Sequence, residues 1–510
     1  MILDVVDVEN IHDLETAKQV IKLQGAELAR LTTKIAELTQ RLAQAEGRNE
    51  PKQLAIELTS LQEQLAALQQ RVFGDSSERR PSDKPPKDKK PKKGHGPRKQ
   101  PNLRELDYLF ELPEDGRKCS CCGESLEPIA GMTEDADFIT VIPREYLLVH
   151  GSRQKYRCKN ECTIVTAPGM PKARDGGTYS IDFAAQVASD KYCDHAPLER
   201  QVRTMKRLGL DIDSQTLWDQ INGLAERLEP TYEAIRQYVL GADVVGVDET
   251  YWRLMSKKGP AKKSSKKWWA WGITTADACW YSINDSRSAK TAAEVLDGFE
   301  GTILVDGYKA YETVARQVGE ALRVANCWAH VRRYFVEAEP NYPEPCQAAI
   351  DLIGELFEIE RGLPKPSELE GDAKQQALEM RAKRRDEESR PIVEKLRAWA
   401  LQQRGLPKGG LRKAVDYMLS LWPGLTTFLD DPNIEIHNNG TERALRGMVL
   451  GRKNHYGSRS VRGTQVAAIY YTLVESAKLC GIDPQAYIRT VAARTIEEPG
   501  SVLLPCNYSG

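Results

Sequence analysis

Two apolar runs in the middle of this chain each stop at an aspartate. Residues 244–247 (Val-Val-Gly-Val) lead into Asp248, and residues 302–305 (Thr-Ile-Leu-Val) lead into Asp306. Short apolar runs of this kind predict buried strands. A carboxylate at the end of a buried strand carries a charge that burial disfavours, so it needs a functional reason. We therefore expect both acids to end their strands at one edge of a sheet.

A third acid, Glu442, follows a predicted helix start at residues 438–441 (Asn-Asn-Gly-Thr). If this helix packs on the sheet, three carboxylates meet at the same edge. Mg²⁺ (or Mn²⁺) prefers such oxygen ligands, and two ions about 4 Å apart serve phosphodiester chemistry. The acids thus predict a two-metal phosphoryl-transfer site in which Asp248 bridges both ions. For any one acid alone, a solvent-exposed carboxylate is the alternative.

Several motifs around these acids resemble those of bacterial transposases of the insertion sequence 66 family. They occur in the family's order, at residues 246–250, 305–311, 327–335, 435–446 and 476–487. The resemblance spans nearly the whole chain. It implies a DDE transposase that binds the terminal inverted repeats of an insertion sequence, cleaves DNA strands and transfers them to target DNA. Family members usually carry Asp where this chain has His437.

The resemblance also implies partners. Double-stranded DNA is expected as transposon end and as target, and accessory proteins of the same element are further candidates. No apolar run approaches the roughly 18 residues that a membrane span needs. With 41% hydrophobic and 28% charged residues, a cytoplasmic, nucleoid-associated protein without a membrane partner is expected.

The N-terminal part predicts a self-associating arm. Leu14, Ile21, Leu28, Ile35 and Leu42 recur every seventh residue, which is typical of a coiled coil. A 3-4 spacing of leucines resumes between residues 54 and 72 after an interruption. A helical hairpin within one chain is the alternative.

A basic linker follows the arm. Residues 79–99 hold ten Lys or Arg against two Asp, a net charge of +8, together with five prolines. This composition predicts a solvated linker that contacts nucleic acid, or a spacer kept soluble by its charge.

Two cysteine pairs predict a structural zinc module. A C-x₂-C-G pattern and a later C-x₃-C pattern can supply four thiolates for one closed tetrahedral Zn²⁺ site, and Cys121 would be a spare thiol. Two unrelated cysteine clusters are the alternative. The expected ligands are Cys119, Cys122, Cys158 and Cys162.

Residues 180–240 are helix-rich and read as a helix-turn-helix with a second helix capped at Ser214. In such a motif the start of the second helix contacts base edges and basic residues of the first hold phosphates. Simple helix packing is the alternative. The expected DNA-binding residues are Arg203, Lys206, Arg207, Gln215 and Thr216.

A second basic group follows Glu442, where it could hold phosphates near the metals. Solvated charges on a surface helix are the alternative. The expected residues are Arg443, Arg446, Arg452, Lys453 and Arg459, with Arg462 beyond them. His330 could contact a metal or its ligands, but a core histidine is the favoured interpretation.

Strand, hairpin, helix, strand, helix and strand follow one another from residue 244, which is the ribonuclease H-like order. We therefore expect a multidomain α+β protein with a ribonuclease H-like α/β catalytic domain and an inserted helical domain. The expected parts are 1–78 (coiled-coil arm), 79–100 (basic linker), 101–175 (zinc-binding module), 176–240 (helix-turn-helix region), 241–338 (catalytic core, first part), 339–432 (inserted helical domain), 433–475 (catalytic core, second part) and 476–510 (helical tail).

Two other classes of protein remain possible on this sequence. A non-catalytic DNA-binding regulator derived from a transposase would be expected to have lost one of the three acids. A repair nuclease on the same fold would need neither the arm nor the insertion.

Overall fold

The computed structural model describes residues 30, 33, 34 and 103–508, with gaps at 108, 114–115, 119, 130–138, 160–161, 175, 256–264 and 404–408. The predicted coiled coil and basic linker lie outside these residues, except for three positions of the arm. The chain divides into two units, and residues 73–145 form the smaller one. The boundary therefore falls inside the predicted zinc module, and each unit is described separately.

The described residues of the smaller unit contain little regular structure. An isolated bridge pairs Lys118 with Ser125, and the Leu126 amide donates to the Arg117 carbonyl over 2.9 Å. The turn between them holds Gly123 at φ 79°, a left-handed conformation that favours glycine. The glycine of the C-x₂-C-G pattern therefore lies in a turn that favours this residue type.

The larger unit opens with a two-stranded antiparallel hairpin, β1 (Lys155–Arg157) and β2 (Ile164–Thr166). Three helices then follow, so the helix-rich stretch is confirmed: α3 (Ile181–Tyr192), α4 (Leu198–Arg207) and α5 (Ser214–Leu240). The cap of α5 is Asp213, whose side chain accepts from the Thr216 amide over 2.6 Å. The prediction of Ser214 as the cap was wrong, because the hydroxyl of Ser214 donates to Glu199 on α4 instead.

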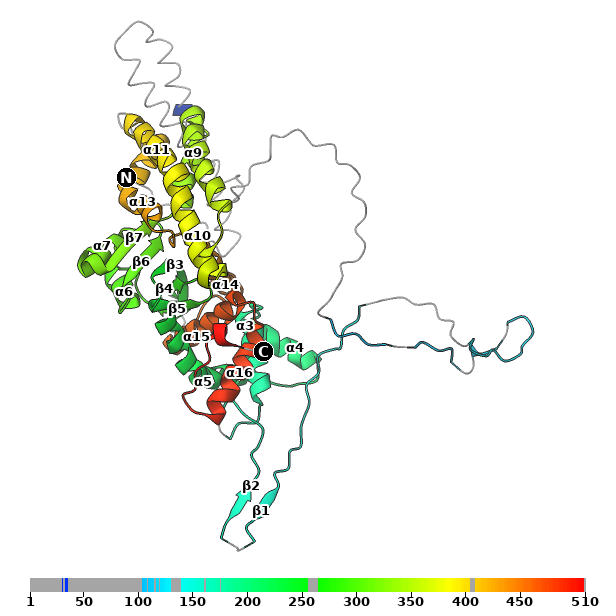
Figure 1. The fold of residues 1–510 in the computed structure, drawn as a ribbon. Helices are drawn as coiled ribbons and strands as arrows, with labels where there is room; N and C mark the ends of the chain where they lie inside the picture. Colours follow the sequence, from blue (N-terminus) through cyan, green and yellow to red (C-terminus); the bar gives the residue numbers. More distant parts are fainter. Residues whose placement is uncertain are drawn as a thin grey trace. The chain divides into compact units, whose positions relative to one another are not determined.

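A five-stranded mixed sheet forms the centre of this unit (Figure 1). Its strands are β3 (Val244–Met255), β4 (Ser265–Thr274), β5 (Cys279–Asn284), β6 (Gly301–Val305) and β7 (Leu322–Asn326). They lie in the order β5-β4-β3-β6-β7. β3, β4 and β5 pair antiparallel, whereas β3, β6 and β7 pair parallel. The predicted sequence of strands, hairpin and helices is therefore present.

β3 is longer than the sequence suggested. It continues for seven residues beyond Asp248, so the prediction that this acid ends its strand was wrong. Parallel pairing with β6 stops at Gly246, but antiparallel pairing with β4 continues to Met255. Asp248 therefore lies just beyond the parallel pairing, where the sheet narrows to β5, β4 and β3. Pairing with β5 ends at Trp269, opposite Tyr251, and beyond it β3 and β4 continue as a two-stranded ribbon.

Helices cover both faces of the sheet. Neighbouring strand residues point to opposite faces, and Glu249 contacts Tyr311 of α7 whereas Gly246 lies against Thr441 of α14. The edge strand β5 is covered by α15, whose Thr472 and Ser476 hydroxyls accept from the Tyr281 and Cys279 amides. The helices next to the sheet are α6 (Ala289–Val295), α7 (Lys309–Val318), α8 (Trp328–Ala338), α14 (Asn439–His455), α15 (Val461–Leu479) and α16 (Pro484–Glu497), with short 3₁₀ turns at Gly319–Ala321 and Pro505–Asn507.

The predicted insertion is helical. It contains α9 (Pro343–Arg361), a 3₁₀ turn (Pro366–Glu368), α10 (Gly371–Arg384), a π-helical turn (Arg385–Ser389), α11 (Arg390–Gln402), α12 (Gly410–Ser420) and α13 (Trp422–Asp430). Its hydrophobic core also includes Leu304 of β6, Ala325 of β7 and Trp328 of α8. The insertion is thus continuous with the sheet rather than a separate globule.

The predicted tail also belongs to the main core. Residue 476, its expected start, lies inside α15, which is buried along most of its length. α15 and α16 pack with α3 and α5 in the core that includes the sheet. None of the helices that the structure describes is both long and apolar enough to span a bilayer.

Candidate active site

Asp248 and Asp306 lie on adjacent parallel strands. The paired residues Gly246 and Leu304 are each followed two positions later by one of the acids, so the same register places Asp248 opposite Asp306. Adjacent strands lie about 4.8 Å apart. The first two predicted acids are therefore brought together at the end of the parallel pairing.

The N-terminus of α14 brings the third acid to the same place. The Asn438 side chain donates to the Val247 carbonyl over 2.9 Å, and the hydroxyls of Thr441 and Thr274 lie 2.6 Å apart. Gly246 makes this close approach possible, since a Cβ there would lie 2.0 Å from the Thr441 hydroxyl. The next residue, Glu442, belongs to the first turn of a helix that is held against β3 on the face of Asp248.

The segment after β7 fixes this helix start from the other side. The Trp328 amide donates to the Ile436 carbonyl over 2.9 Å, and the Asn438 amide donates to the Cys327 thiol sulfur over 3.2 Å. One turn further along α8, Nε2 of His330 lies 3.5 Å from Oε1 of Glu442. His330 is therefore a neighbour of the third acid.

His437 lies apart from this contact. Its ring stacks on Phe357 of α9, with ring centroids 5.9 Å apart. His437, which stands where family members usually carry Asp, thus contacts the insertion through Phe357.

The three acids influence one another electrostatically. Burial raises the pKa of Asp248 to about 8, and the nearby charges of Glu249, Asp306 and Glu442 add to this effect. Accumulated negative charge of this kind is what a divalent cation neutralises.

The three acids carry carboxylate oxygens, which are the ligands that Mg²⁺ prefers. Oε1 of Glu442 is buried and accepts no hydrogen bond within the described residues. Across the described ranges, no three His, Cys, Asp or Glu side chains are packed closely enough to hold a metal as they stand. Mg²⁺ keeps several waters and needs few protein ligands, so three converging carboxylates still fit it.

The charge on Asp248 predicts a pH-dependent stability in the absence of metal. An unfolded Asp has a pKa of about 3.9, so the folded protein binds the extra proton and loses stability as the pH rises from about 4 to 8. Asp248→Asn removes this penalty. In EDTA, its unfolding free energy should exceed that of the wild type by about 1–2 kcal/mol at pH 9, allowing for partial exposure, and by little at pH 4. Equal thermal melting curves at pH 9 would contradict the charge repulsion.

Sequence reasoning missed a second network behind the acids. Both oxygens of the buried Glu249 carboxylate are occupied, one by Arg287 at 2.5 Å and the other by the Tyr311 hydroxyl. The Glu249 amide donates to Asp248 over 2.8 Å, and the Tyr308 amide donates to Asp306 over 2.8 Å. Glu249 was visible inside the first-aspartate motif, but nothing in the sequence linked Arg287 to it.

The basic residues after Glu442 divide into two groups. Arg443, Arg446, Lys453 and Arg459 are exposed, whereas Arg452 is only 7% exposed. Arg452 donates to the Thr250 hydroxyl over 3.0 Å and lies over the Tyr251 ring at 3.5 Å from its centroid. Arg452 therefore joins α14 to β3. Arg462 likewise bonds to Asn222 of α5 over 2.9 Å.

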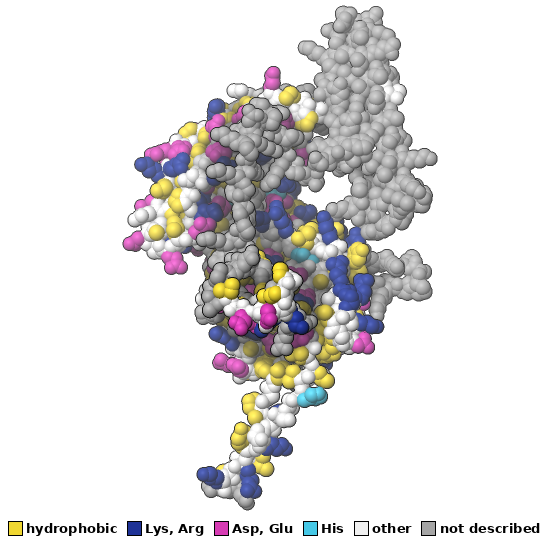
Figure 2. Space-filling model, turned by 90° about the vertical axis from the view of Figure 1, so that its right-hand side faces the viewer, with side chains coloured by type: hydrophobic (Ala, Val, Ile, Leu, Met, Phe, Trp, Pro, Cys, Tyr) yellow, Lys and Arg dark blue, Asp and Glu magenta, His cyan; other side chains and the backbone are white. Residues whose placement is uncertain are grey.

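The predicted helix-turn-helix residues lie around the α4–α5 turn. Arg203, Lys206, Arg207 and Gln215 are exposed, and Thr216 is half-buried. Gln215 donates to Asp219 one turn later over 2.9 Å. Figure 2 shows that basic side chains gather on the face of the protein drawn there.

The predicted zinc ligands are distributed over both units. Cys119 lies outside the described residues, and Cys122 belongs to the smaller unit and is exposed. In the larger unit, Cys158 and Cys162 flank the β1–β2 loop, which the Cys158 amide closes by donating to the Thr163 carbonyl over 2.9 Å.

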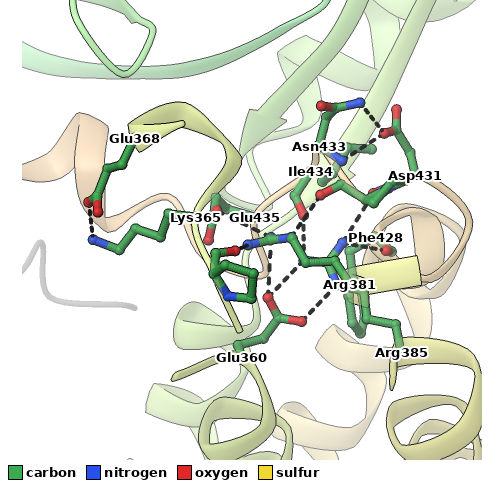
Figure 3. Close-up of polar contacts among 12 residues, drawn as sticks. Glu360, Lys365, Glu368, Arg381, Arg385, Phe428, Asp431, Asn433, Ile434 and Glu435 are labelled. Atoms are coloured by element: carbon green, nitrogen blue, oxygen red, sulfur yellow. Dashed lines mark hydrogen bonds and ion pairs between the residues drawn. The ribbon is translucent and has the colours of Figure 1, made fainter. Parts of the chain in front are cut away.

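Two buried arginines connect the insertion to the segment that leads to Glu442 (Figure 3). Arg385 is fully buried and bonds to both oxygens of Glu360 at 2.7 Å. The same guanidinium donates to the carbonyls of Phe428, Asp431 and Ile434 over 2.8–3.1 Å.

Arg381, 1% exposed, extends this network. It donates to the Pro432 carbonyl over 2.9 Å and to Glu435 over 3.2 Å. Burial and the nearby Arg385 charge lower the pKa of Arg381. We call Glu360, Arg381 and Arg385 the arginine clamp, because together they hold residues 428–435 in place.

The chain is similar to known proteins over most of its length. The sequence model of the family described as "Transposase IS66 family" matches residues 176–466. Three relatives from Sinorhizobium fredii (strain NBRC 101917 / NGR234) carry the description "uncharacterized protein". The protein y4jD is 31% identical over 80% of this chain and 81% of its own length. The proteins y4hP and y4qI are each 28% identical, over 75% and 84% of this chain and over 71% and 79% of their own lengths.

Proposed function

This chain belongs to the transposase IS66 family, and we propose that it is the enzyme that cleaves and transfers DNA strands for an insertion sequence. The observation that carries the proposal is the convergence of Asp248, Asp306 and Glu442 from two strands and a helix. The three acids are far apart in the sequence, and β3, β6 and α14 bring them near one another.

Asp248, Asp306 and Glu442 would hold two Mg²⁺ or Mn²⁺ ions. Such ions activate an attacking oxygen and stabilise the leaving oxygen of a phosphodiester. The chain itself orients the acids: backbone amides bond to Asp248 and Asp306, and α14 is fixed to β3 beside Glu442. The ribonuclease H-like strand order supports the same assignment.

The reaction would have two stages at one site. Hydrolysis of a phosphodiester at the element's end frees a 3′ hydroxyl, and that hydroxyl then attacks a phosphate of the target DNA. Exposed Arg443, Arg446, Lys453 and Arg459 follow Glu442 and would hold backbone phosphates near the acids. Arg203, Lys206, Arg207, Gln215 and Thr216 would bind the terminal repeat through the helix-turn-helix.

The second candidate is a DNA-binding regulator without catalysis. It would use the same helix-turn-helix and basic surface but would not need the carboxylates. The retention of all three acids, together with the raised pKa of Asp248, favours the enzyme. Self-association through the N-terminal coiled coil and contact with accessory proteins of the element are part of either proposal.

A cleavage assay separates these two functions. Sequencing the DNA that flanks the gene identifies the inverted repeats, and a labelled duplex with one repeat then serves as the substrate. The enzyme should produce a strand ending in a 3′ hydroxyl at the repeat boundary in Mg²⁺ and no product in EDTA. Specific binding without cleavage in Mg²⁺ or Mn²⁺ would favour the regulator.

The zinc module gives a separate prediction. The purified, reduced protein should contain close to one equivalent of zinc, because a closed structural site is nearly full. Cys122→Ser and Cys158→Ser should each lower this content, whereas Cys506→Ser, at an exposed cysteine far along the chain, should not. A wild-type content below about half an equivalent would refute the module.

A further inference from the structure

A row of aromatic and basic side chains lies on the face of the sheet that carries Glu249. Tyr251 and Trp269 are direct partners across β3 and β4. The Lys267 ammonium lies 5.7 Å from the ring centroid of Tyr251 and 4.9 Å from that of Trp269. The Arg287 guanidinium lies 4.9 Å from the centroid of Trp269 and 4.0 Å from that of Tyr308. We call these five residues the aromatic row.

The aromatic row ends at the candidate active site. The Tyr308 amide donates to the Asp306 carboxylate over 2.8 Å, and the Tyr308 hydroxyl donates to the Arg287 carbonyl over 2.6 Å. Arg287 is in turn bonded to Glu249, the residue after Asp248. The aromatic row therefore meets the acids at Asp306, at the end of β6, whereas Asp248 and α14 lie on the other face of the sheet.

The row is not part of the hydrophobic core. Trp271, two residues further along the same face, is fully buried against Tyr311 of α7. Trp269, Tyr251 and Tyr308 are only half-buried, and Lys267 is exposed. Trp269 and Tyr308 pack against the edge of the core and Tyr251 lies beside Trp269 on β3, so part of each ring remains exposed.

We propose that the aromatic row is a stacking platform for unpaired nucleotides of the DNA strand next to the scissile phosphate. This inference rests on the proposed function and specifies its substrate, a DNA end whose terminal base pairs open before cleavage. Every base offers a flat face to an aromatic ring, so such binding needs no particular sequence. Lys267 and Arg287 would hold the phosphates between the stacked bases.

Base stacking on an aromatic ring is stronger than a cation–π contact, so a base can displace the Lys267 ammonium from the Trp269 ring. A cation over an exposed aromatic ring shifts an equilibrium by only about two- to fivefold. A base stacked on an aromatic side chain contributes about 5- to 150-fold. Lys267 is exposed and can leave Trp269, whereas Arg287 remains held by Glu249 over Tyr308 and the buried Arg452 remains over Tyr251. Trp269 is therefore the ring that a base can reach.

Binding of a fluorescent oligo-dT strand to the full-length protein tests the platform without any chemistry. Trp269→Leu keeps apolar bulk but removes the π-face, and Trp269→Phe keeps a ring. The Leu variant should bind the single strand about 5- to 100-fold more weakly than the wild type, the Phe variant should stay within about threefold, and duplex binding should be unchanged in both. Tyr238→Leu, at an exposed tyrosine of α5, is the control and should bind like the wild type.

Cleavage of two versions of the terminal duplex tests whether the aromatic row takes part in the reaction. One version is fully paired and the other carries about three mismatches at the cleavage site, which lowers the cost of opening. Trp269→Leu should lose rate mainly on the paired version. Equal oligo-dT binding by Trp269→Leu and the wild type, with equal rates on both duplexes, would overturn the platform. A wild type that cleaves neither duplex would instead refute the proposed function.

Discussion

Asp248→Asn, Asp306→Asn and Glu442→Gln should each lower DNA strand cleavage by about 10³-fold or more while leaving binding to the terminal repeat within a few fold of the wild type. An amide keeps the shape of the side chain but removes the charge that, on the proposed function, would hold the metals and stabilise the transition state. The DNA would then be held mainly by phosphate contacts elsewhere. Cleavage of the labelled duplex and a gel-shift titration measure the two effects separately.

Glu435→Gln is the matched control for the third acid. Glu435 is seven residues away and bonds to Arg381 in the arginine clamp. Its amide should still accept that bond, so cleavage should fall by less than about tenfold. If Glu442→Gln cuts normally and Glu435→Gln does not, the third acid is misassigned. Normal cleavage by Asp248→Asn, Asp306→Asn and Glu442→Gln alike would refute the three-acid catalytic site.

Arg385→Met should lower the unfolding free energy of the chain by about 3–5 kcal/mol. The substitution keeps much of the volume but takes this donor from the buried carbonyls of Phe428 and Ile434 and leaves Glu360 with only Arg381, at 3.3 Å, as its partner. Urea unfolding followed by tryptophan fluorescence measures the loss. Cleavage should also fall, because residues 428–435 lead directly to the helix that carries Glu442.

The neighbouring Arg384 provides the control. It bonds to Glu388 four residues later, and both side chains are partly exposed. Arg384→Met should therefore change the unfolding free energy far less than Arg385→Met does. Similar losses for both variants would mean that the clamp is no more important than a surface ion pair.

The sequence predicted the elements of the sheet because their signals are local. The apolar runs before Asp248 and Asp306 and the turn between β4 and β5 are visible within a few residues. The length of β3 was missed because residues 250–255 pair with β4, ten or more positions away, and at Leu254 with the distant Ser458. The point at which β3 loses its parallel partner therefore gives no signal in the neighbouring sequence.

The same reasoning explains the missed residues of the site. Arg381 and Arg385 lie in a polar stretch that reads as an exposed helix, and their burial depends on Glu360 and on carbonyls more than 40 positions away. Arg452 looked like a phosphate ligand because its charge is visible in the sequence and its contact with β3 is not. Only a three-dimensional contact distinguishes a buried guanidinium from a solvated one.

The insertion between β7 and α14 has a consequence for the order of events during synthesis. Asp248 and Asp306 leave the ribosome long before Glu442, and residues 339–432 must be made in between. Domains fold progressively as a chain is synthesised. A nascent or truncated chain that ends before α14 therefore holds two carboxylates without the third and, on the proposed function, should not cleave DNA.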